Sequence, residues 1–287
     1  ENIIFIGKGY SSLLGKKETN IQKLKENHMP IIETDKELAK FLQIEYNTLR
    51  YLVYHRDVIT FDNYYRFDIP KKSGGTRHIA APKTQLKTAQ RQILEQILQN
   101  VEISGQAHGF IKSRSVLTSA KTHNTSPGLL INIDLENFFP TITFERVRGL
   151  YQSFGYSGYI SSLLAMVCTY CERMPLEIKG EIKYIKTSDR ILPQGSPASP
   201  MITNMICKRM DKRINGLCQK LGVIYTRYAD DMSFSYTGEL ENFAIGSFLN
   251  SIQKIIEAEG FHINAQKTHI LRKHNRQYIT GIVINNA

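Results

Sequence analysis

Apolar and polar positions follow two different periods along this chain, and the changes of period mark the expected helices and strands. Apolar residues recur at helical spacing over residues 34–55, 83–101, 159–170, 199–221 and 240–259. Alternating or continuous apolar runs predict strands over residues 64–70, 76–81, 129–135, 223–236, 261–263 and 279–284. From residue 128 onward, the order of these elements predicts an α+β domain with a mixed β-sheet and helices on one face.

Turn residues separate two of the predicted strand pairs. Lys71–Gly75 lies between the strands at residues 64–70 and 76–81, so the tip of that hairpin is basic. Lys179-Gly180 divides two short alternating runs, which predicts a β-hairpin insertion near residues 176–186.

Three aspartates stand out because their surroundings are apolar. Asp230-Asp231 lies at the centre of the run 223–236, which predicts a hairpin with two carboxylates at its turn. Asp134 ends the apolar run Leu129–Leu135, where an unpaired buried carboxylate would be costly. If the two strands are neighbours, the three side chains form one cluster of oxygen ligands that suits Mg²⁺ and phosphoryl transfer.

The composition is that of a globular protein with thiols in reduced form. Hydrophobic residues make up 41% of the chain, and no apolar run approaches the roughly 18 residues needed to span a membrane. Cys168 and Cys171 have C-x-x-C spacing, but no second pair or nearby histidine completes a zinc site. We therefore expect buried free thiols and a reducing, cytoplasmic location.

The net charge of +11 indicates a polyanionic partner. Its distribution along the chain is uneven, because one segment crowds basic side chains with no acid between them: Lys71, Lys72, Arg77, Lys83, Lys87 and Arg91. Neighbouring glycines would let the backbone approach phosphate closely.

Seven segments occur in an order that resembles the motifs of reverse transcriptases: Lys71–Pro82, Ala107–Phe110, Asp134–Phe139, Leu192–Pro200, Tyr228–Asp231, Glu259–Thr268 and Tyr278–Gly281. Within that family the chain is similar to the bacterial retron and group II intron-like branch. Retrons carry Asn-Ala-x-x-His and Val-Thr-Gly signatures, and the corresponding stretches here are Ser119–His123 and Ile279–Gly281, each with one departure.

The resemblance implies the fingers and palm of a right-hand polymerase, with a ferredoxin-like palm. We expect an N-terminal helical region and fingers over residues 1–127 and the palm over residues 128–287. A thumb is not evident, because the chain stops just after the palm.

The resemblance also implies roles for individual residues. Asp134, Asp230, Asp231 and the Leu135 carbonyl would hold two Mg²⁺ ions, with Mn²⁺ as an alternative, and Lys267 would assist catalysis at the pyrophosphate. The incoming nucleotide would contact Lys72, Arg77, Phe139, Gln194 and Gly195, and the ring of Phe139 would exclude a 2′-OH. The residues expected to contact RNA are Lys83, Lys87, Arg91, Arg114 and His123.

The implied function is an RNA-directed DNA polymerase of a retron. Such an enzyme copies part of a structured non-coding RNA into a branched RNA–DNA molecule (msDNA), often alongside an effector protein in anti-phage defence. Group II intron-like, diversity-generating and abortive-infection reverse transcriptases are the alternatives, followed by an inactive RNA-binding scaffold.

Overall fold

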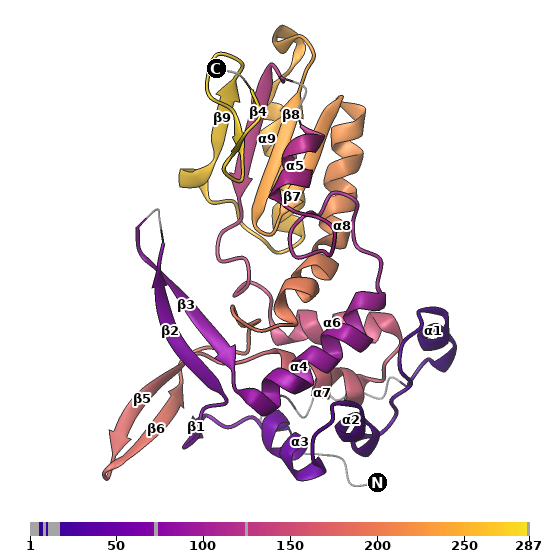
Figure 1. The fold of residues 1–287 in the computed structure, drawn as a ribbon, viewed down its shortest axis with the longest axis vertical. Helices are drawn as coiled ribbons and strands as arrows, with labels where there is room; N and C mark the ends of the chain where they lie inside the picture. The colour runs from indigo at the N-terminus through magenta and orange to yellow at the C-terminus, as the bar shows by residue number, and fades with distance from the viewer. Residues whose placement is uncertain (1–5, 8–9, 11–17, 72–73, 124–125, 286–287) are drawn as a thin grey trace. The chain divides into compact units, whose positions relative to one another are not determined.

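The chain divides into two compact units, which are described here separately. The computed structural model describes residues 6–7, 10, 18–71, 74–123 and 126–285 (Figure 1). The first unit consists of residues 1–102 and 139–202, and the second of residues 103–138 and 203–287. This division differs from the expected boundary at residue 127, because residues 139–202 pack with the N-terminal region.

The first unit is built around a helix that is apolar on all sides. Nearly every residue of α7 (Gly158–Cys168) is buried, as expected of a helix without a polar face, and it contacts the four neighbours α2, α3, α4 and α6. The bounds of those helices, and of the short helix that precedes them, are Ile21–Glu26 (α1), Asp35–Phe41 (α2), Tyr46–Val53 (α3), Thr84–Gln96 (α4) and Phe144–Phe154 (α6).

Two hairpins complete the first unit. β2 (Tyr64–Pro70) pairs with β3 (Thr76–Pro82), as the alternation predicts. β5 (Arg173–Ile178) and β6 (Glu181–Lys186) form the hairpin expected near residues 176–186, and β1 (Val58–Ile59) pairs with β6 at its edge. The predicted helix over residues 34–55 is a pair, and Thr34 and Glu37 form the capping box that opens α2.

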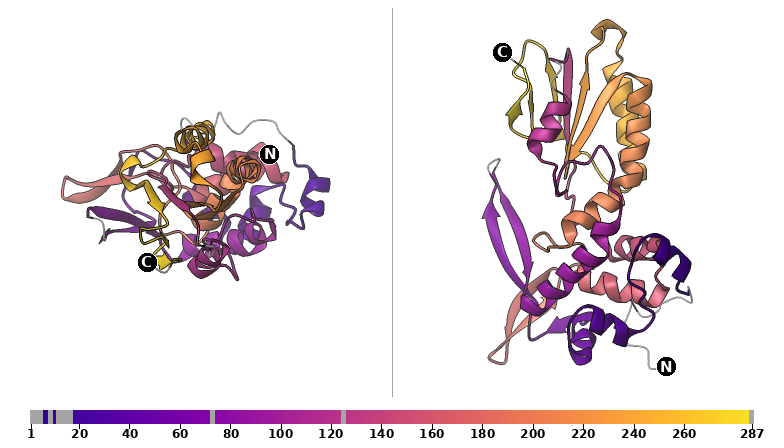
Figure 2. Two further views of the ribbon diagram at one scale, coloured as in Figure 1. Left: turned by 90° about the horizontal axis from the view of Figure 1, so that it is seen from above. Right: turned by 45° about the vertical axis from the view of Figure 1, so that its right-hand side comes forward.

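The second unit is a four-stranded sheet in the order β7-β8-β4-β9. Its strands are β4 (Leu129–Asp134), β7 (Val223–Tyr228), β8 (Asp231–Tyr236) and β9 (His269–Arg272). Helices α8 (Ser199–Lys220) and α9 (Ile245–Ala258) lie on one face and α5 (Val116–Thr122) on the other (Figure 2). In chain order this is the 2-3-1-4 arrangement of a ferredoxin-like domain.

Two expectations for this sheet are corrected. It was predicted to be mixed, but β7 with β8, β8 with β4 and β4 with β9 are all antiparallel. The reason is that β8 lies between β7 and β4, so the crossover from β4 to β7 skips a strand.

The predicted strand over residues 279–284 is instead a small hairpin of β10 (Tyr278–Ile279) and β11 (Ile282–Val283), turned by Thr280 and Gly281 at positive φ.

Alternation along the strands gives the sheet one apolar and one polar face. Tyr225 of β7, Phe234 of β8 and Ile131 of β4 are cross-strand neighbours, and Phe234 packs on Phe248 of α9. The residues between them in sequence point to the opposite face, which carries hydroxyl, amide and carboxylate groups.

Arg227 is the exception on the apolar face, because it is charged and fully buried. Its guanidinium forms an ion pair with the equally buried Asp211 of α8, with nitrogen–oxygen distances of 2.9 and 2.8 Å. Burial alone would lower the pKa of Arg227, but the nearby Asp211 carboxylate raises it overall, so the side chain stays charged.

We expect Asp211→Asn to lower the free energy of unfolding by about 3–5 kcal/mol, because the buried guanidinium would lose its counter-charge. Urea denaturation measures this change. The double variant Arg227→Met, Asp211→Leu removes both charges and should lose less stability than Asp211→Asn. A smaller loss for the single variant would show that the ion pair does not stabilise this unit.

Candidate active site

Asp134 and Asp231 lie directly opposite each other in the register of β4 and β8. Both belong to the polar face of the sheet, since they alternate with Ile133 and Met232 on the apolar face. Asp230 occupies the turn between β7 and β8, after Ala229 at φ +57°, and its carbonyl accepts a hydrogen bond from the Leu135 N–H at 3.0 Å. The hairpin therefore brings the predicted acids to one end of two adjacent strands.

The electrostatic cost of this arrangement appears in the pKa of Asp231, which is raised to about 6. Burial is the largest cause, followed by the negative charges of Asp230 and Asp134, while Lys267 acts in the opposite direction. A cation that binds among these carboxylates would relieve both the desolvation and the repulsion.

Lys267 already supplies one positive charge to this cluster. Its Nζ lies 3.1 and 3.2 Å from the two carboxylate oxygens of Asp134. The segment that carries it is fixed along the end of β4, because the Asn264 N–H donates to the Asp134 carbonyl and the Glu136 N–H to the His262 carbonyl, both at 2.8 Å. About half of the Lys267 side chain is exposed, so the ammonium has room to move.

The chemistry of these donors fits a hard divalent cation. Carboxylate and carbonyl oxygens are the ligands of Mg²⁺, which is usually held by one or two carboxylates together with substrate phosphates. Over the described residues, no group of three or more histidine, cysteine, aspartate or glutamate side chains is arranged so that it could hold a metal ion. A magnesium ion bound to these carboxylates would take its other ligands from water and substrate phosphates.

Phe138 and Phe139 have different environments, although they are adjacent. The Phe138 ring is buried and packs on Phe261 with 5.6 Å between ring centroids. Phe139 belongs to the other unit by its contacts and is half-buried. Only Phe138 is therefore a core residue, which leaves Phe139 as the ring that a ligand could touch.

The predicted nucleotide-binding residues of the first unit lie near one hairpin. Arg77 is exposed on β3, and the Gln194 carbonyl accepts a hydrogen bond from the Ala80 N–H of the same strand at 2.8 Å. Gly195 has φ +120°, and a Cβ there would lie 2.8 Å from Ile79. Only glycine fits this close approach. Lys72 lies outside the described residues.

The predicted RNA contacts divide into two groups. Lys87 and Arg91 are exposed one turn apart on α4, and the Lys83 ammonium lies 3.9 Å from the centroid of the Phe61 ring. Arg114 is half-buried, and its Nη1 donates to backbone carbonyls of its own unit, including Ser104 at 2.8 Å.

His123 requires a correction, because its ring is fully buried and cannot touch RNA directly in this structure. Its Nε2 lies 2.8 Å from the Thr226 hydroxyl and its Nδ1 2.7 Å from the Ser235 hydroxyl. The Ser119 hydroxyl also bonds to Thr226, at 2.8 Å. Ser119 and His123, the first and last residues of the Ser119–His123 stretch, thus fix α5 to the polar face of the sheet.

Sequence patterns did not predict the buried polar residues that support the site, above all Arg227, Asp211 and Asn204. One signal was present, because Arg227 occupies an inward position in a strand whose neighbours on that face are apolar. Its partners on α8 left no comparable signal, since polar residues are common on helices.

Comparison with known proteins identifies the relatives of this chain. The model of the family "Reverse transcriptase (RNA-dependent DNA polymerase)" matches residues 69–284. The retron Mx162 reverse transcriptase of Myxococcus xanthus is 37% identical over 93% of this chain and 56% of its own length. The retron Ec86 reverse transcriptase of Escherichia coli is 35% identical over 93% of this chain and 76% of its own length. The chain spans little more than half the length of the Myxococcus relative.

Solved structures share the fold at much lower identity. Telomerase from Candida albicans has a TM-score of 0.55 at 12% identity, and the match covers 79% of this chain and 47% of the telomerase chain. Telomerase from Candida tropicalis has a TM-score of 0.56 at 13% identity, with coverage of 79% and 44%. At such identities the matches establish the fold alone. Among the described residues, no helix combines the length and apolar character that crossing a membrane requires.

Stability should fall on acidification because of His123. Burial, followed by the charge of His108, lowers the pKa of His123 to about 4 from an unfolded value of 6.5. Folding therefore favours the neutral ring. The contribution of His123 to the free energy of unfolding is complete above pH 6.5 and is lost as the pH falls toward 4.

We expect the free energy of unfolding to fall over this window by up to about 3 kcal/mol from His123. Urea denaturation at several pH values measures the slope. The variant His123→Gln should show a shallower slope than the wild type, while His55, whose pKa is also lowered to about 4, maintains part of it in both. If the free energy of unfolding of His123→Gln depended on pH as steeply as that of the wild type, the assignment of this pH dependence to His123 would be contradicted.

Proposed function

Since the chain belongs to the reverse transcriptase family and is similar there to retron enzymes, we propose that it is an RNA-directed DNA polymerase of a retron. The observation that carries the proposal is the register that sets Asp134 opposite Asp231, with Asp230 in the adjoining turn. This places three carboxylates in the chain segments where the family resemblance locates its catalytic motifs.

The family uses divalent metal ions, and we propose two Mg²⁺ ions, with Mn²⁺ as an alternative. Such ions would neutralise the developing charge and align the attacking and leaving oxygens. Asp134, Asp230, Asp231 and the Leu135 carbonyl would hold them. Lys267 would leave Asp134 for the departing pyrophosphate, where its ammonium can stabilise negative charge or donate a proton.

The first unit would bind the nucleotide and the RNA. Arg77, together with Lys72, would hold the triphosphate, because a guanidinium matches the geometry of phosphate oxygens. Gln194 would contact the nucleotide and Gly195 would admit it closely, while Phe139 would exclude a ribose. The exposed Lys87 and Arg91, together with the half-buried Lys83, would contact phosphates of a folded RNA.

The retron assignment implies a structured non-coding RNA as template and primer and a branched RNA–DNA product, msDNA. It also implies an effector protein and a role in anti-phage defence. Four buried free cysteines are consistent with the reducing cytoplasm. Among the alternatives, a group II intron-like enzyme would share the active site but make an unbranched product. Sequencing the nucleic acid that copurifies with the protein distinguishes them, because a short DNA joined to an RNA through a 2′-5′ branch is expected of the retron enzyme alone among these candidates.

Asp230→Asn should reduce DNA synthesis by at least about 100-fold, because a ligand of the metal ions loses its charge. Primer extension on an RNA template measures the rate, and filter binding measures RNA affinity, which we expect to remain within twofold. Asp189→Asn is the matched control, since its side chain is 90% exposed and lies outside the cluster. Undiminished synthesis by the Asp230 variant would overturn the metal assignment.

Phe139→Ala should admit ribonucleotides, because the ring would no longer exclude a 2′-OH. We expect the ratio of kcat/KM for dNTP over rNTP to fall by about 10- to 100-fold. Phe138→Leu is the comparison variant, and it should lose stability without a change in sugar selectivity, since Phe138 is a core residue. Equal selectivity in wild type and Phe139→Ala would reject this role.

A further inference from the structure

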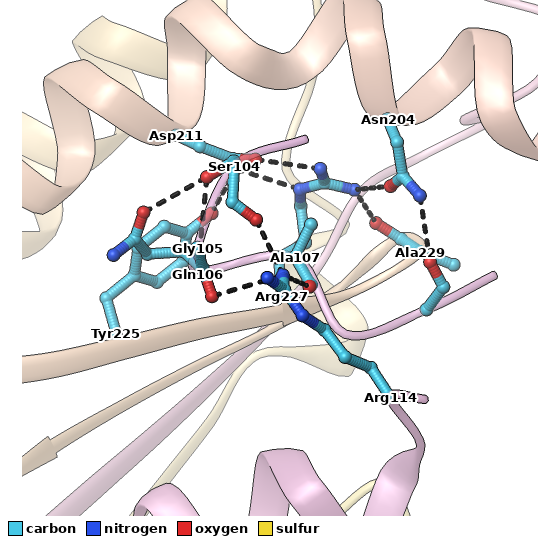
Figure 3. Close-up of polar contacts among 11 residues, drawn as sticks. Ser104, Gly105, Gln106, Ala107, Arg114, Asn204, Asp211, Tyr225, Arg227 and Ala229 are labelled. Atoms are coloured by element: carbon cyan, nitrogen blue, oxygen red, sulfur yellow. Dashed lines mark hydrogen bonds and ion pairs between the residues drawn. The ribbon is translucent and has the colours of Figure 1, made fainter. Parts of the chain in front are cut away.

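The buried Arg227 does more than pair with Asp211, because its guanidinium also reaches the turn that carries the catalytic acids. Its Nη1 donates to the Ala229 carbonyl at 3.0 Å and to the Asn204 Oδ1 at 3.2 Å (Figure 3). The other two nitrogens bind Asp211, which in turn accepts a hydrogen bond from the Tyr225 hydroxyl at 2.8 Å. Every arm of the guanidinium therefore has a fixed partner.

The carbonyl that Arg227 holds belongs to the residue just before Asp230. Ala229 adopts φ +57°, a left-handed conformation that a residue with a Cβ rarely adopts without support. The hydrogen bond from Arg227 fixes the orientation of the peptide plane between Ala229 and Asp230. The direction in which the chain enters Asp230 and Asp231 depends on that plane.

A loop from earlier in the chain encloses the same turn from the other side. The Arg227 N–H donates to the Gln106 carbonyl and the His108 N–H to the Arg227 carbonyl, both at 2.7 Å, in a short parallel bridge. Asn204 Nδ2 donates to the Gly109 carbonyl at 2.8 Å. A Cβ on Gly109 would lie 2.7 Å from the Ala229 nitrogen, so the loop and the turn are in direct backbone contact.

Arg114 fixes that loop. Its Nη1 donates to the carbonyls of Ser104 at 2.8 Å and Ala107 at 2.5 Å (Figure 3). The loop is thus held by one arginine and the turn by another, and Asn204 joins the two through its amide.

We propose that Arg227 is a positioning residue for catalysis, which acts through the Ala229 carbonyl to set the two carboxylates of Asp230 and Asp231. The proposal rests on the proposed function, since it assigns how that active site is held. Asn204 and Asp211 orient the guanidinium, and the residues 104–109 prevent the turn from moving away. Arginine is required because a lysine ammonium cannot bind Asp211, Asn204 and Ala229 together in one plane.

The expected effect on the rate is large, because a displacement of about 1 Å in a catalytic group can cost about 100-fold. We expect Arg227→Lys to lower the single-turnover rate of nucleotide addition by about 10- to 100-fold at saturating dNTP. The affinity for RNA should remain within about twofold, because no residue proposed to contact RNA lies in the turn, and the KM for dNTP should change less than the rate does. A residue that only stabilised the fold would lower the melting temperature and leave the rate of the folded protein unchanged.

Two further variants make the experiment specific. Asn204→Ala keeps the ion pair of Arg227 and Asp211 but removes the link to the loop, and it should lower the rate in the same direction. If Arg227→Lys fails to fold, the rate of Asn204→Ala decides whether the network around Arg227 positions the catalytic turn. Arg213→Lys is the matched control, since Arg213 lies on α8 like Asp211 but forms its ion pair with Glu259 at the end of α9. Its rate should equal that of the wild type.

Hydrogen exchange gives a readout independent of activity. In Arg227→Lys the amides of peptides spanning residues 227–232 should exchange faster, while those of the Arg213→Lys control should not. Unchanged exchange in that peptide, or a wild-type rate in both Arg227→Lys and Asn204→Ala, would overturn the proposal. If the wild type itself made no DNA, the proposed function would fail, and the exchange data would still decide whether Arg227 fixes the turn.

Discussion

The antiparallel pairing of β4 with β8 is the constraint on which the rest of the site depends. It sets Asp134 and Asp231 opposite each other, at a separation that two isolated carboxylates would avoid. The surrounding fold must supply what offsets this repulsion. Lys267 contributes a counter-charge on one side, but burial and, after it, the charges of Asp230 and Asp134 still raise the pKa of Asp231. The negative charge that Lys267 does not balance favours the binding of a cation.

The two faces of the same sheet have separate tasks. The apolar face packs under α8 and α9 and gives the second unit its core, for example through Phe234 and Phe248. The polar face carries the acids and is covered beyond them by α5, whose His123 and Ser119 satisfy the hydroxyls of Thr226 and Ser235. Period-two alternation lets one set of strands supply both faces.

The two stretches that resemble retron signatures meet in this second unit. Ala120 of α5 and Ile279 of β10 are buried in one apolar cluster with Leu130 of β4. The Ile279–Gly281 stretch provides the turn between β10 and β11 as well, with Thr280 and Gly281 at positive φ. Residues separated by more than 150 positions in the chain therefore act together as a packing unit behind the catalytic strands.

Local patterns allowed much of this fold to be predicted, because strand alternation and capping depend on neighbouring residues. The span of β2 follows from such a pattern, as does the position of Asp134 at a strand end. The antiparallel character of the whole sheet could not be predicted, since it depends on which strand inserts between β4 and β7. The burial of His123 was missed because its partners, Thr226 and Ser235, lie more than 100 residues away. The network around Arg227 was missed because its partners Asp211 and Asn204 are polar residues on a helix, where polar residues are common and do not indicate burial.

The ammonium of Lys267 has a consequence for how cations reach this cluster. Because Asp134 already has a positive partner at 3.1 Å, another cation that approaches that carboxylate is repelled by the Lys267 ammonium and competes with it. The relevant equilibrium is then a competition between two charges, and its position depends on where the released ammonium can go. An anion arriving beside the cluster offers the lysine a new partner and so makes the exchange easier. Cation and anion would therefore bind with positive cooperativity, without any change in the backbone.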